Sequence, residues 1–251
     1  MKKSFLLIAF IFGLLSCKST LIIQDIHMQN IPNYENISTI DPAIEQLVAP
    51  YKQNLEADMQ EIIAISTVEL VKEKPESLLT NYLADLLLEE GARYAYQHPL
   101  QPLPNLAYLN YGGLRTQLPK GEITVGKIFE LMPFENEMVL VQLTGADLYE
   151  LASRLAANGG DCVSGIKLGI KDNKIGTFEI AGNPLNQTAL YWVVTNDYVA
   201  EGGDGMTMLL NRKKYIQTGL KLRDCFIDHM RNEYQKGRTI SPKLDGRIYY
   251  E

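Results

Sequence analysis

The segment Leu106-Ala107-Tyr108-Leu109-Asn110-Tyr111-Gly112-Gly113-Leu114-Arg115 joins a short apolar run to a pair of glycines. An apolar run of this length, bounded by a turn signal, predicts a buried strand over residues 106–110. The paired glycines allow a tight turn and a close approach of the backbone to a ligand. Asn110 and Arg115 flank this turn, and an amide and a guanidinium suit the edge of a base and an anionic or hydroxylated group. A plain turn with a surface arginine would explain the segment equally well.

Two further segments mix aromatic and polar residues in a comparable way. In Met132-Pro133-Phe134-Glu135-Asn136, the proline is expected to end a helix, and Phe134 follows among polar residues. In residues 196–205, a strand pattern delivers Tyr198 to a glycine-rich turn with Asp204 at its tip. An exposed ring serves either as a stacking platform or as part of the core. A carboxylate in such a turn can accept hydrogen bonds from sugar hydroxyls, although similar turns also occur without any ligand.

The remaining patterns predict both helices and strands. Asp41 and Pro42 are expected to open a long amphipathic helix that continues through Ile62 and Ile63 and is kinked or split at Pro50. Further helices are expected after Ser77, from the capping box at residues 144–147 to about residue 157, and over roughly residues 220–234. Strands are expected at 68–71, 106–110, 139–143, 165–170, 174–180 and 190–195. Because these elements alternate without regular βαβ units, the predicted fold class is α+β, with a mixed β-sheet packed against helices.

Four motifs in this order resemble the C-terminal domain of the 5′-nucleotidase/UDP-sugar hydrolase family. NYGGLR at 110–115 is similar to the family's NGGGIR turn, and residues 132–145 are similar to its PFGN element, strand and LTG helix start. The stretch NDYVAEGGDG at 196–205 resembles NDFLASGGDG, and residues 76–85 resemble the ES-x-LGNL-x-AD helix. Order and spacing agree over about residues 65–235. The resemblance therefore implies the fold of that domain for nearly all of the chain beyond the N-terminal segment.

The resemblance also implies a substrate-binding site for a nucleotide or nucleoside. Phe134 and Tyr198 would sandwich the base, and stacking of this kind contributes about 1–3 kcal/mol per base. Asn110 would contact the base, and Asn136 would support it. Arg115 and Asp204 would hold sugar hydroxyls or phosphate.

The chain departs from the family pattern at several positions. Pro75, next to Lys74, stands where the family has an arginine, and Thr80 and Glu135 replace glycines of the LGNL and PFGN elements. Tyr198 replaces a phenylalanine, which keeps the ring face. These departures leave open a third reading, in which the domain is a scaffold with a decayed pocket.

The family's hydrolysis is performed by a separate metallophosphatase domain that holds two metal ions. This chain has three histidines, His27, His98 and His229, and none lies in a DxH, GDxxD or GNHE setting. We therefore expect no catalytic or metal-binding residue in this chain. We expect the divalent metal pair in a separately encoded metallophosphatase domain that acts with this chain in nucleotide catabolism. The alternative is a non-catalytic nucleotide- or nucleoside-binding lipoprotein.

The N-terminus resembles a bacterial lipoprotein signal. A basic start at Lys2 and Lys3 precedes an apolar run over residues 5–15, which is shorter than the about 20 residues that span a bilayer. The run ends in Leu-Leu-Ser-Cys17, a pattern typical of a lipid-modified cysteine. We predict a signal peptide at 1–16, lipidation of Cys17, a tether at 17–39 and a folded domain at 40–251, exported and membrane-anchored in the cell envelope. An ordinary signal peptide that happens to precede a cysteine is the alternative.

Composition limits the class of protein further. The 251 residues are 46% hydrophobic, which suits one domain with a substantial core. The net charge of −6 argues against nucleic acid as a partner, because such proteins need a basic surface to displace counterions. Export would permit a disulfide between Cys162 and Cys225, but two small buried residues are the favoured interpretation.

Overall fold

The structure is a computed structural model that describes residues 41–99 and 101–251, in two units, 1–48 and 49–251. The first described element is helix α2 (Pro42–Met59), a single helix that contains Pro50. Asp41 accepts a hydrogen bond from the Ala43 backbone N–H at 2.9 Å, which confirms the predicted helix start. The predicted signal peptide, Cys17 and the tether lie outside the described residues. Among the residues described, no helix combines the length and apolar character needed to cross a membrane.

A mixed five-stranded sheet forms the centre of the unit 49–251. Its strand order is β10-β4-β9-β2-β5, and the parallel pairing of β2 with β9 interrupts otherwise antiparallel neighbours. The strands are β2 (Leu106–Leu109), β4 (Glu137–Thr144), β5 (Cys162–Ser164), β9 (Leu190–Asn196) and β10 (Lys214–Lys221). The predicted fold class, a mixed sheet packed with helices, is therefore confirmed.

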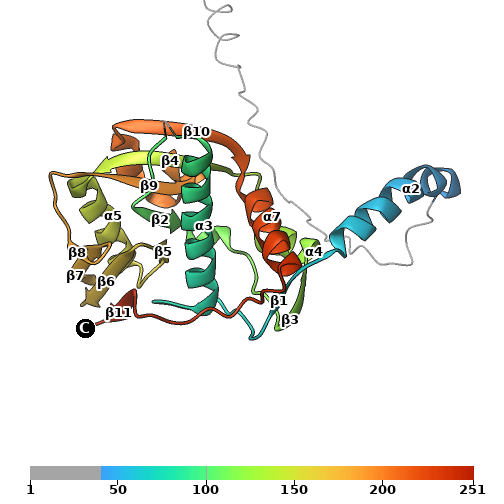
Figure 1. Cartoon of the computed structure of the whole chain (residues 1–251), viewed down its shortest axis with the longest axis horizontal. Coiled ribbons are helices and arrows are strands. Elements are labelled where there is room, and N and C mark those ends of the chain that lie inside the picture. Colours follow the sequence, from blue (N-terminus) through green and yellow to red (C-terminus); the bar gives the residue numbers. More distant parts are fainter. Residues whose placement is uncertain (1–40, 100) are drawn as a thin grey trace, which may run out of the picture. The chain divides into compact units, whose positions relative to one another are not determined.

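Both faces of the central sheet carry buried side chains, although the edge strand β10 is largely exposed. Successive side chains of a strand point to opposite faces, and in β4 Met138 and Leu140 enter one hydrophobic cluster while Val139 and Val141 enter the other. The first cluster includes side chains of α3 (Leu78–Gln97) and α7 (Leu222–Gln235). The second includes side chains of α5 (Gly145–Ala157). Figure 1 shows α3 running across one face of the sheet, with α5 on the other side of the strands.

Smaller elements complete the architecture. A four-stranded sheet has the order β11-β6-β7-β8, and a two-stranded sheet pairs β1 with β3. These strands are β1 (Ile62–Ser66), β3 (Gly121–Thr124), β6 (Ile166–Lys171), β7 (Lys174–Ile180), β8 (Asn183–Pro184) and β11 (Ile248–Tyr250). Short helices are α4 (Val125–Leu131), α6 (Asp197–Ala200), η1 (Tyr111–Gly113), η2 (Gly203–Gly205) and η3 (Thr207–Asn211).

The predicted starts of α3 and α5 are confirmed by reciprocal capping. Ser77 Oγ accepts from the Thr80 backbone N–H at 3.2 Å, and Thr80 Oγ1 accepts from the Ser77 N–H at 3.0 Å. Thr144 and Asp147 form the equivalent box at the start of α5. Thr80, which replaces a family glycine, therefore has a structural partner in this chain.

Several predicted boundaries were wrong. Ile62 and Ile63 belong to β1 rather than to the first helix, because these β-branched residues pair with β3 instead of continuing the helical turn. Residues 68–71 form no strand, and Leu70 makes an isolated bridge to Leu118. Residue 220 still lies in β10, a strand that the sequence patterns did not reveal, and α7 begins at Leu222.

The two cysteines of the folded unit do not pair. Cys162 and Cys225 are free, buried thiols, as the favoured interpretation predicted. The Cys162 thiol donates to the Thr80 carbonyl oxygen at 3.0 Å, which links β5 to α3.

The topology brings many loops to one edge of the central sheet. β2 and β9 run parallel, so their carboxyl ends lie at the same edge. β4 and β5 run antiparallel to these strands and therefore begin there, while β10 ends there. The pairing of Met138 with Asn196, and of Leu109 with Cys162, fixes which residues meet. Residues 110–115, 132–136 and 196–205 are thereby brought to this edge.

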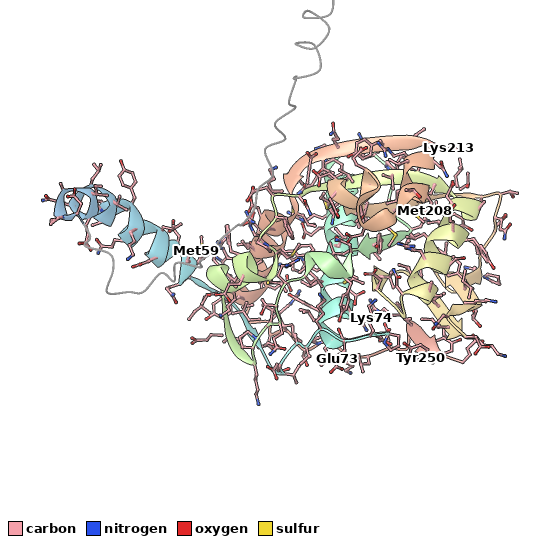
Figure 2. The ribbon with its side chains drawn as sticks, turned by 180° about the vertical axis from the view of Figure 1, so that it is seen from behind. Met59, Glu73, Lys74, Met208, Lys213 and Tyr250 are labelled. Atoms are coloured by element: carbon pink, nitrogen blue, oxygen red, sulfur yellow. The ribbon has the colours of Figure 1, made fainter. Side chains whose placement is uncertain are left out.

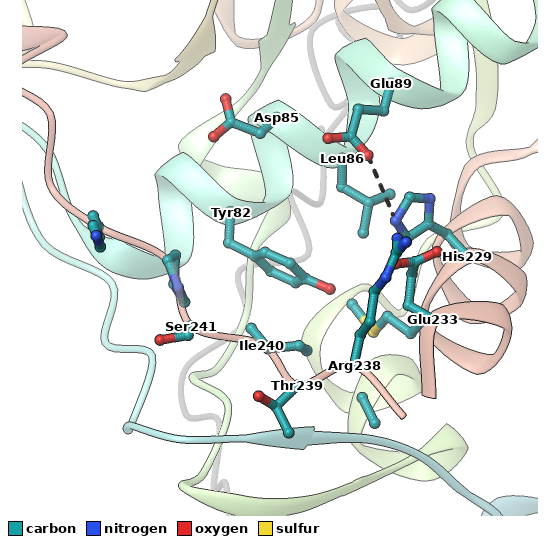
Figure 3. Close-up of a pocket in the computed structure, with 14 residues that line it drawn as sticks. Tyr82, Asp85, Leu86, Glu89, His229, Glu233, Arg238, Thr239, Ile240 and Ser241 are labelled. Atoms are coloured by element: carbon teal, nitrogen blue, oxygen red, sulfur yellow. Dashed lines mark hydrogen bonds and ion pairs between the residues drawn. The ribbon is translucent and has the colours of Figure 1, made fainter. Parts of the chain in front are cut away.

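A buried carboxylate joins α3 to α7. Glu90 is 2% exposed, pairs with Arg93, and accepts from His229 Nδ1 at 2.9 Å. Burial opposes ionisation of Glu90, but the hydrogen bonds from His229 and Arg93 outweigh it and lower its pKa. The hydrogen bond to Glu90 raises the pKa of His229 above its ordinary value of 6.5. His229 also faces Glu89 at 3.6 Å beside a cavity of about 310 Å³ (Figure 3).

We predict that this contact makes stability depend on pH. Because the pKa of His229 is higher in the folded state, its contribution, about 1 kcal/mol, is complete below about pH 6.5 and is lost as the pH rises through the raised pKa. Urea unfolding of wild type and His229→Gln should therefore differ more at about pH 5.5 than at about pH 8.5. His98→Gln is the matched control, since that ring contacts the Tyr94 carbonyl. An equal difference at both pH values would contradict this assignment.

Candidate functional site

The structure brings all six predicted site residues to one cavity of about 280 Å³. The complete lining consists of Asn110, Gly112, Gly113, Arg115, Phe134, Asn136, Tyr198 and Asp204. These residues come from three segments that are far apart in the sequence and meet at the loop-bearing edge of the central sheet. A cavity of this size, with a few convergent polar groups, suits a small organic ligand.

Two half-exposed aromatic rings line this cavity. Phe134 and Tyr198 are each 47% exposed, although neighbouring residues such as Val199 are fully buried. Single exposed aromatic residues are ordinary on a protein surface, but two rings that line one cavity leave apolar faces available to a ligand. The Arg115 guanidinium carbon lies 6.0 Å from the centre of the Phe134 ring. The cavity thus combines flat apolar surfaces with one cation.

A chain of hydrogen bonds organises the polar side of the cavity. The buried Asn196 caps α6 by accepting from the Val199 N–H at 3.0 Å, and its Nδ2 donates to Asn110 Oδ1 at 3.0 Å. Asn110 Nδ2 in turn donates to Asp204 Oδ2 at 2.7 Å. The Tyr198 hydroxyl donates to Asp204 Oδ1 at 2.9 Å. The Asp204 carboxylate is therefore held from two sides.

The glycine-rich turn lets Tyr198 lie directly against the backbone. A Cβ at Gly203 would stand 2.5 Å from the Tyr198 ring, closer than any real contact allows. Gly203 is thus required for the ring's position. Asp204 follows with a left-handed backbone, at φ 53°, which short Asx residues adopt more readily than most. The glycine-rich turn that the sequence predicted therefore makes room for the Tyr198 ring and positions Asp204 beside it.

Arg223 fastens the loop that carries Phe134, and sequence patterns did not single it out. The side chain is nearly buried and donates from Nη1 to the Met132 carbonyl at 3.1 Å. It also pairs with Glu135 and stacks on Phe129, with 3.9 Å between the guanidinium carbon and the ring centre. The hydrogen bond from Arg223 lowers the pKa of Glu135. The carboxylate that replaces a family glycine is therefore bound by Arg223 outside the cavity lining.

A second unpredicted residue, Asp161, holds the Gly-Gly turn. This buried carboxylate precedes β5 and accepts from the Tyr111 N–H at 2.7 Å and from the Cys162 N–H at 2.9 Å. Burial raises the pKa of Asp161 to about 6. No local signal marks it, because its partner in the turn is 50 residues away in the sequence.

Two lysines lie beside the same turn. Lys72 Nζ stands 3.9 Å above the centre of the Tyr111 ring and donates to the Leu114 carbonyl at 2.7 Å. Burial, followed by the nearby charge of Arg115, lowers the pKa of Lys72. Lys74, labelled in Figure 2, lies 4.9 Å from the same ring centre. These side chains add positive charge next to Arg115.

The described histidines have structural neighbours. His98 contacts the Tyr94 carbonyl, and His229 contacts Glu90. Within the part of the chain that the structure describes, His, Cys, Asp and Glu side chains do not gather in a group of three or more that fits a metal ion.

Fold and cavity together define an α+β domain with a cavity at one edge of a mixed sheet. The model of the 5′-nucleotidase C-terminal domain family matches residues 59–211. The chain therefore belongs to this family, as its motifs predicted.

Individual relatives agree with this assignment. The apyrase of Tabanus yao is 28% identical over 234 residues, which cover 82% of this chain and 41% of the relative. The trifunctional nucleotide phosphoesterase YfkN of Bacillus subtilis is 28% identical over 229 residues, which cover 83% of this chain and 15% of the relative. Among solved structures, the 5′-nucleotidase precursor from Thermus thermophilus has a TM-score of 0.68 and 29% identity, covering 82% of this chain and 42% of that one. The chain thus spans less than half the length of these relatives.

We predict that Arg223 rigidifies the Phe134 loop. Replacing Arg223 with Met removes the buried charge-assisted bond to the Met132 carbonyl, which contributes about 1.5–3 kcal/mol, so the loop should open about tenfold more often or more. Hydrogen exchange reports this opening at the Leu222 amide, which donates to the Asn136 carbonyl, and at the Glu137 amide, which donates to Asp197.

The matched control is Arg231→Met, on the same helix. Arg231 pairs with Glu61 and Asp228, away from the Phe134 loop. The Arg231→Met variant should leave hydrogen exchange at the Leu222 and Glu137 amides unchanged. Unchanged exchange in Arg223→Met would refute the role of Arg223.

Proposed function

We propose that this chain is the nucleotide-binding domain of a 5′-nucleotidase-type phosphoester hydrolase that acts in nucleotide catabolism. The supporting observation is the single cavity that unites two half-exposed aromatic rings with Arg115 and Asp204. Membership of the family supports the same proposal.

In this proposal a nucleobase lies against Phe134 and Tyr198, with Asn110 and Asn136 at its edge. Stacking on aromatic rings tolerates any base, because every base offers a π-face. Asp204 accepts from sugar hydroxyls, and the Arg115 guanidinium, with Lys72 nearby, attracts phosphate. The positive charge beside Tyr111 partly offsets the chain's net charge of −6 at the place where an anionic ligand would bind.

Hydrolysis then requires a metal-bearing domain, which we propose is contributed by a separate metallophosphatase chain. Such a domain supplies a divalent metal pair that activates water and stabilises the charge of the transferring phosphoryl group. This chain's own residues would bind and orient the nucleotide for that chemistry.

Phe134→Ala should weaken nucleotide binding. Losing one stacking platform costs about 1–3 kcal/mol, which corresponds to a roughly 5- to 150-fold higher Kd. Calorimetric titration with AMP and with adenosine measures this change. Tyr149→Ala is the control, because Tyr149 is a similarly exposed aromatic residue on α5 outside the cavity lining. If the wild-type chain bound neither ligand, the proposal would be wrong.

Assays of AMP hydrolysis with Mn²⁺ or Zn²⁺ test whether this chain binds the nucleotide while a separate chain hydrolyses it. We expect the purified chain to be inactive alone and to gain activity when mixed with a separately encoded metallophosphatase domain. Strong activity of the chain alone would refute the proposal. Binding that no such partner ever converts into hydrolysis would instead establish the alternative, a non-catalytic binding lipoprotein.

We also propose that the chain is exported and anchored to a membrane of the cell envelope through a lipid on Cys17, a residue outside the described part of the structure. The lipoprotein-like run that ends at Cys17 supports this. A similar protein of Listeria monocytogenes is named a cell wall protein. Metabolic labelling with an alkyne fatty acid should mark the wild type and not Cys17→Ser; equal labelling would exclude this anchor.

A further inference from the structure

We infer that the Tyr198 hydroxyl lowers the site's preference for a ribose hydroxyl over a deoxyribose by occupying part of the Asp204 carboxylate. This inference rests on the proposed function, since it concerns the sugar of a nucleotide bound in the same cavity. It arises from one atom, the hydroxyl that distinguishes Tyr198 from a phenylalanine.

Asp204 has protein partners on both carboxylate oxygens before a ligand arrives. Asn110 Nδ2 donates to Oδ2 at 2.7 Å, and the Tyr198 hydroxyl donates to Oδ1 at 2.9 Å. The Asp204 backbone N–H also lies 3.3 Å from the Tyr198 oxygen. An ionised carboxylate offers about four acceptor positions, so these bonds use part of the capacity that would otherwise serve a ligand.

The Tyr198 hydroxyl and the Asp204 carboxylate cannot easily move apart. The Tyr198 ring lies against the Gly203 backbone, where even a Cβ would collide with it. On the other side, Asn110 is tied to Asn196, whose side chain is 1% exposed and caps α6. The hydroxyl and the carboxylate are thus held together by the fold rather than by a chance side-chain rotamer.

A sugar hydroxyl that approaches Oδ1 from the side on which Tyr198 lies competes with the tyrosine hydroxyl, and one that approaches from another side shares the same oxygen with it. In the wild type it displaces or shares an existing charge-assisted hydrogen bond, and the gain is the difference between two similar bonds. In a variant without the tyrosine hydroxyl, water occupies that position, and a ligand displaces it without breaking a bond within the protein. Removing the hydroxyl should accordingly increase discrimination in favour of ribose while the ring face remains.

The test compares adenosine with 2′-deoxyadenosine and 3′-deoxyadenosine by calorimetric titration of the full chain. We expect wild-type affinities within about threefold of one another, because the gain from a ribose hydroxyl is small. Tyr198→Phe should raise the ratio of deoxyadenosine Kd to adenosine Kd by about threefold or more for at least one deoxynucleoside. Affinity for the deoxynucleosides should change by less than about twofold, because the stacking ring is retained.

Asp204→Gly serves as the second variant, because glycine tolerates the left-handed backbone of this residue and leaves no side-chain acceptor. Combined with Tyr198→Phe, it should remove the ribose preference that Tyr198→Phe creates. An unchanged or smaller ratio in Tyr198→Phe would overturn the inference, as would a ribose preference that persists without Asp204. Failure of the wild type to bind any of the three nucleosides would overturn the proposed function itself. The two failures are therefore distinguishable.

Discussion

The register of β4 between β9 and β10 is the constraint on which both the core and the site depend. Along this strand, Met138 lies opposite Asn196, and Thr144 lies opposite Leu190. Because side chains alternate between faces, a slip of one residue would exchange Val139 and Val141 with their neighbours and place every β4 side chain on the wrong face. The same slip would shift the loop that ends at Asn136 relative to Tyr198. Selection for a packed core therefore also maintains the geometry of the cavity.

The cavity is supported by residues that do not line it. Arg223 binds the Phe134 loop from α7, Asp161 binds the Gly-Gly turn from the start of β5, and Asn196 orients Asn110 from the end of β9. Each comes from a different strand end or helix start at the same sheet edge. A binding site whose loops are each fixed in this way loses less conformational freedom when a ligand binds.

Two of the positions at which the chain departs from the family pattern have local explanations. Thr80 completes a capping box with Ser77, and Glu135 pairs with Arg223. Nothing in the structure explains Pro75, whose backbone lies against Gly160. All three lie outside the cavity lining, so they give no structural reason to regard the pocket as decayed. Tyr198 is the departure that does reach the cavity, and there it alters the environment of Asp204.

The sequence by itself determined the fold class and the starts of α2, α3 and α5, and its resemblance to a known family pointed to six residues that line one cavity. These features depend on local chemistry: capping boxes at Ser77 and Thr144, an apolar run before Gly112, and a glycine-rich turn after Tyr198. Tertiary structure decided those strands and side-chain contacts whose partners are distant in the chain. β1 forms at Ile62 because β3 pairs with it, and β10 forms because β4 offers it an edge. Arg223, Asp161 and the bond between Tyr198 and Asp204 gain their roles only when strand ends meet, since a side chain's partners across a sheet edge leave no periodic signal in the sequence.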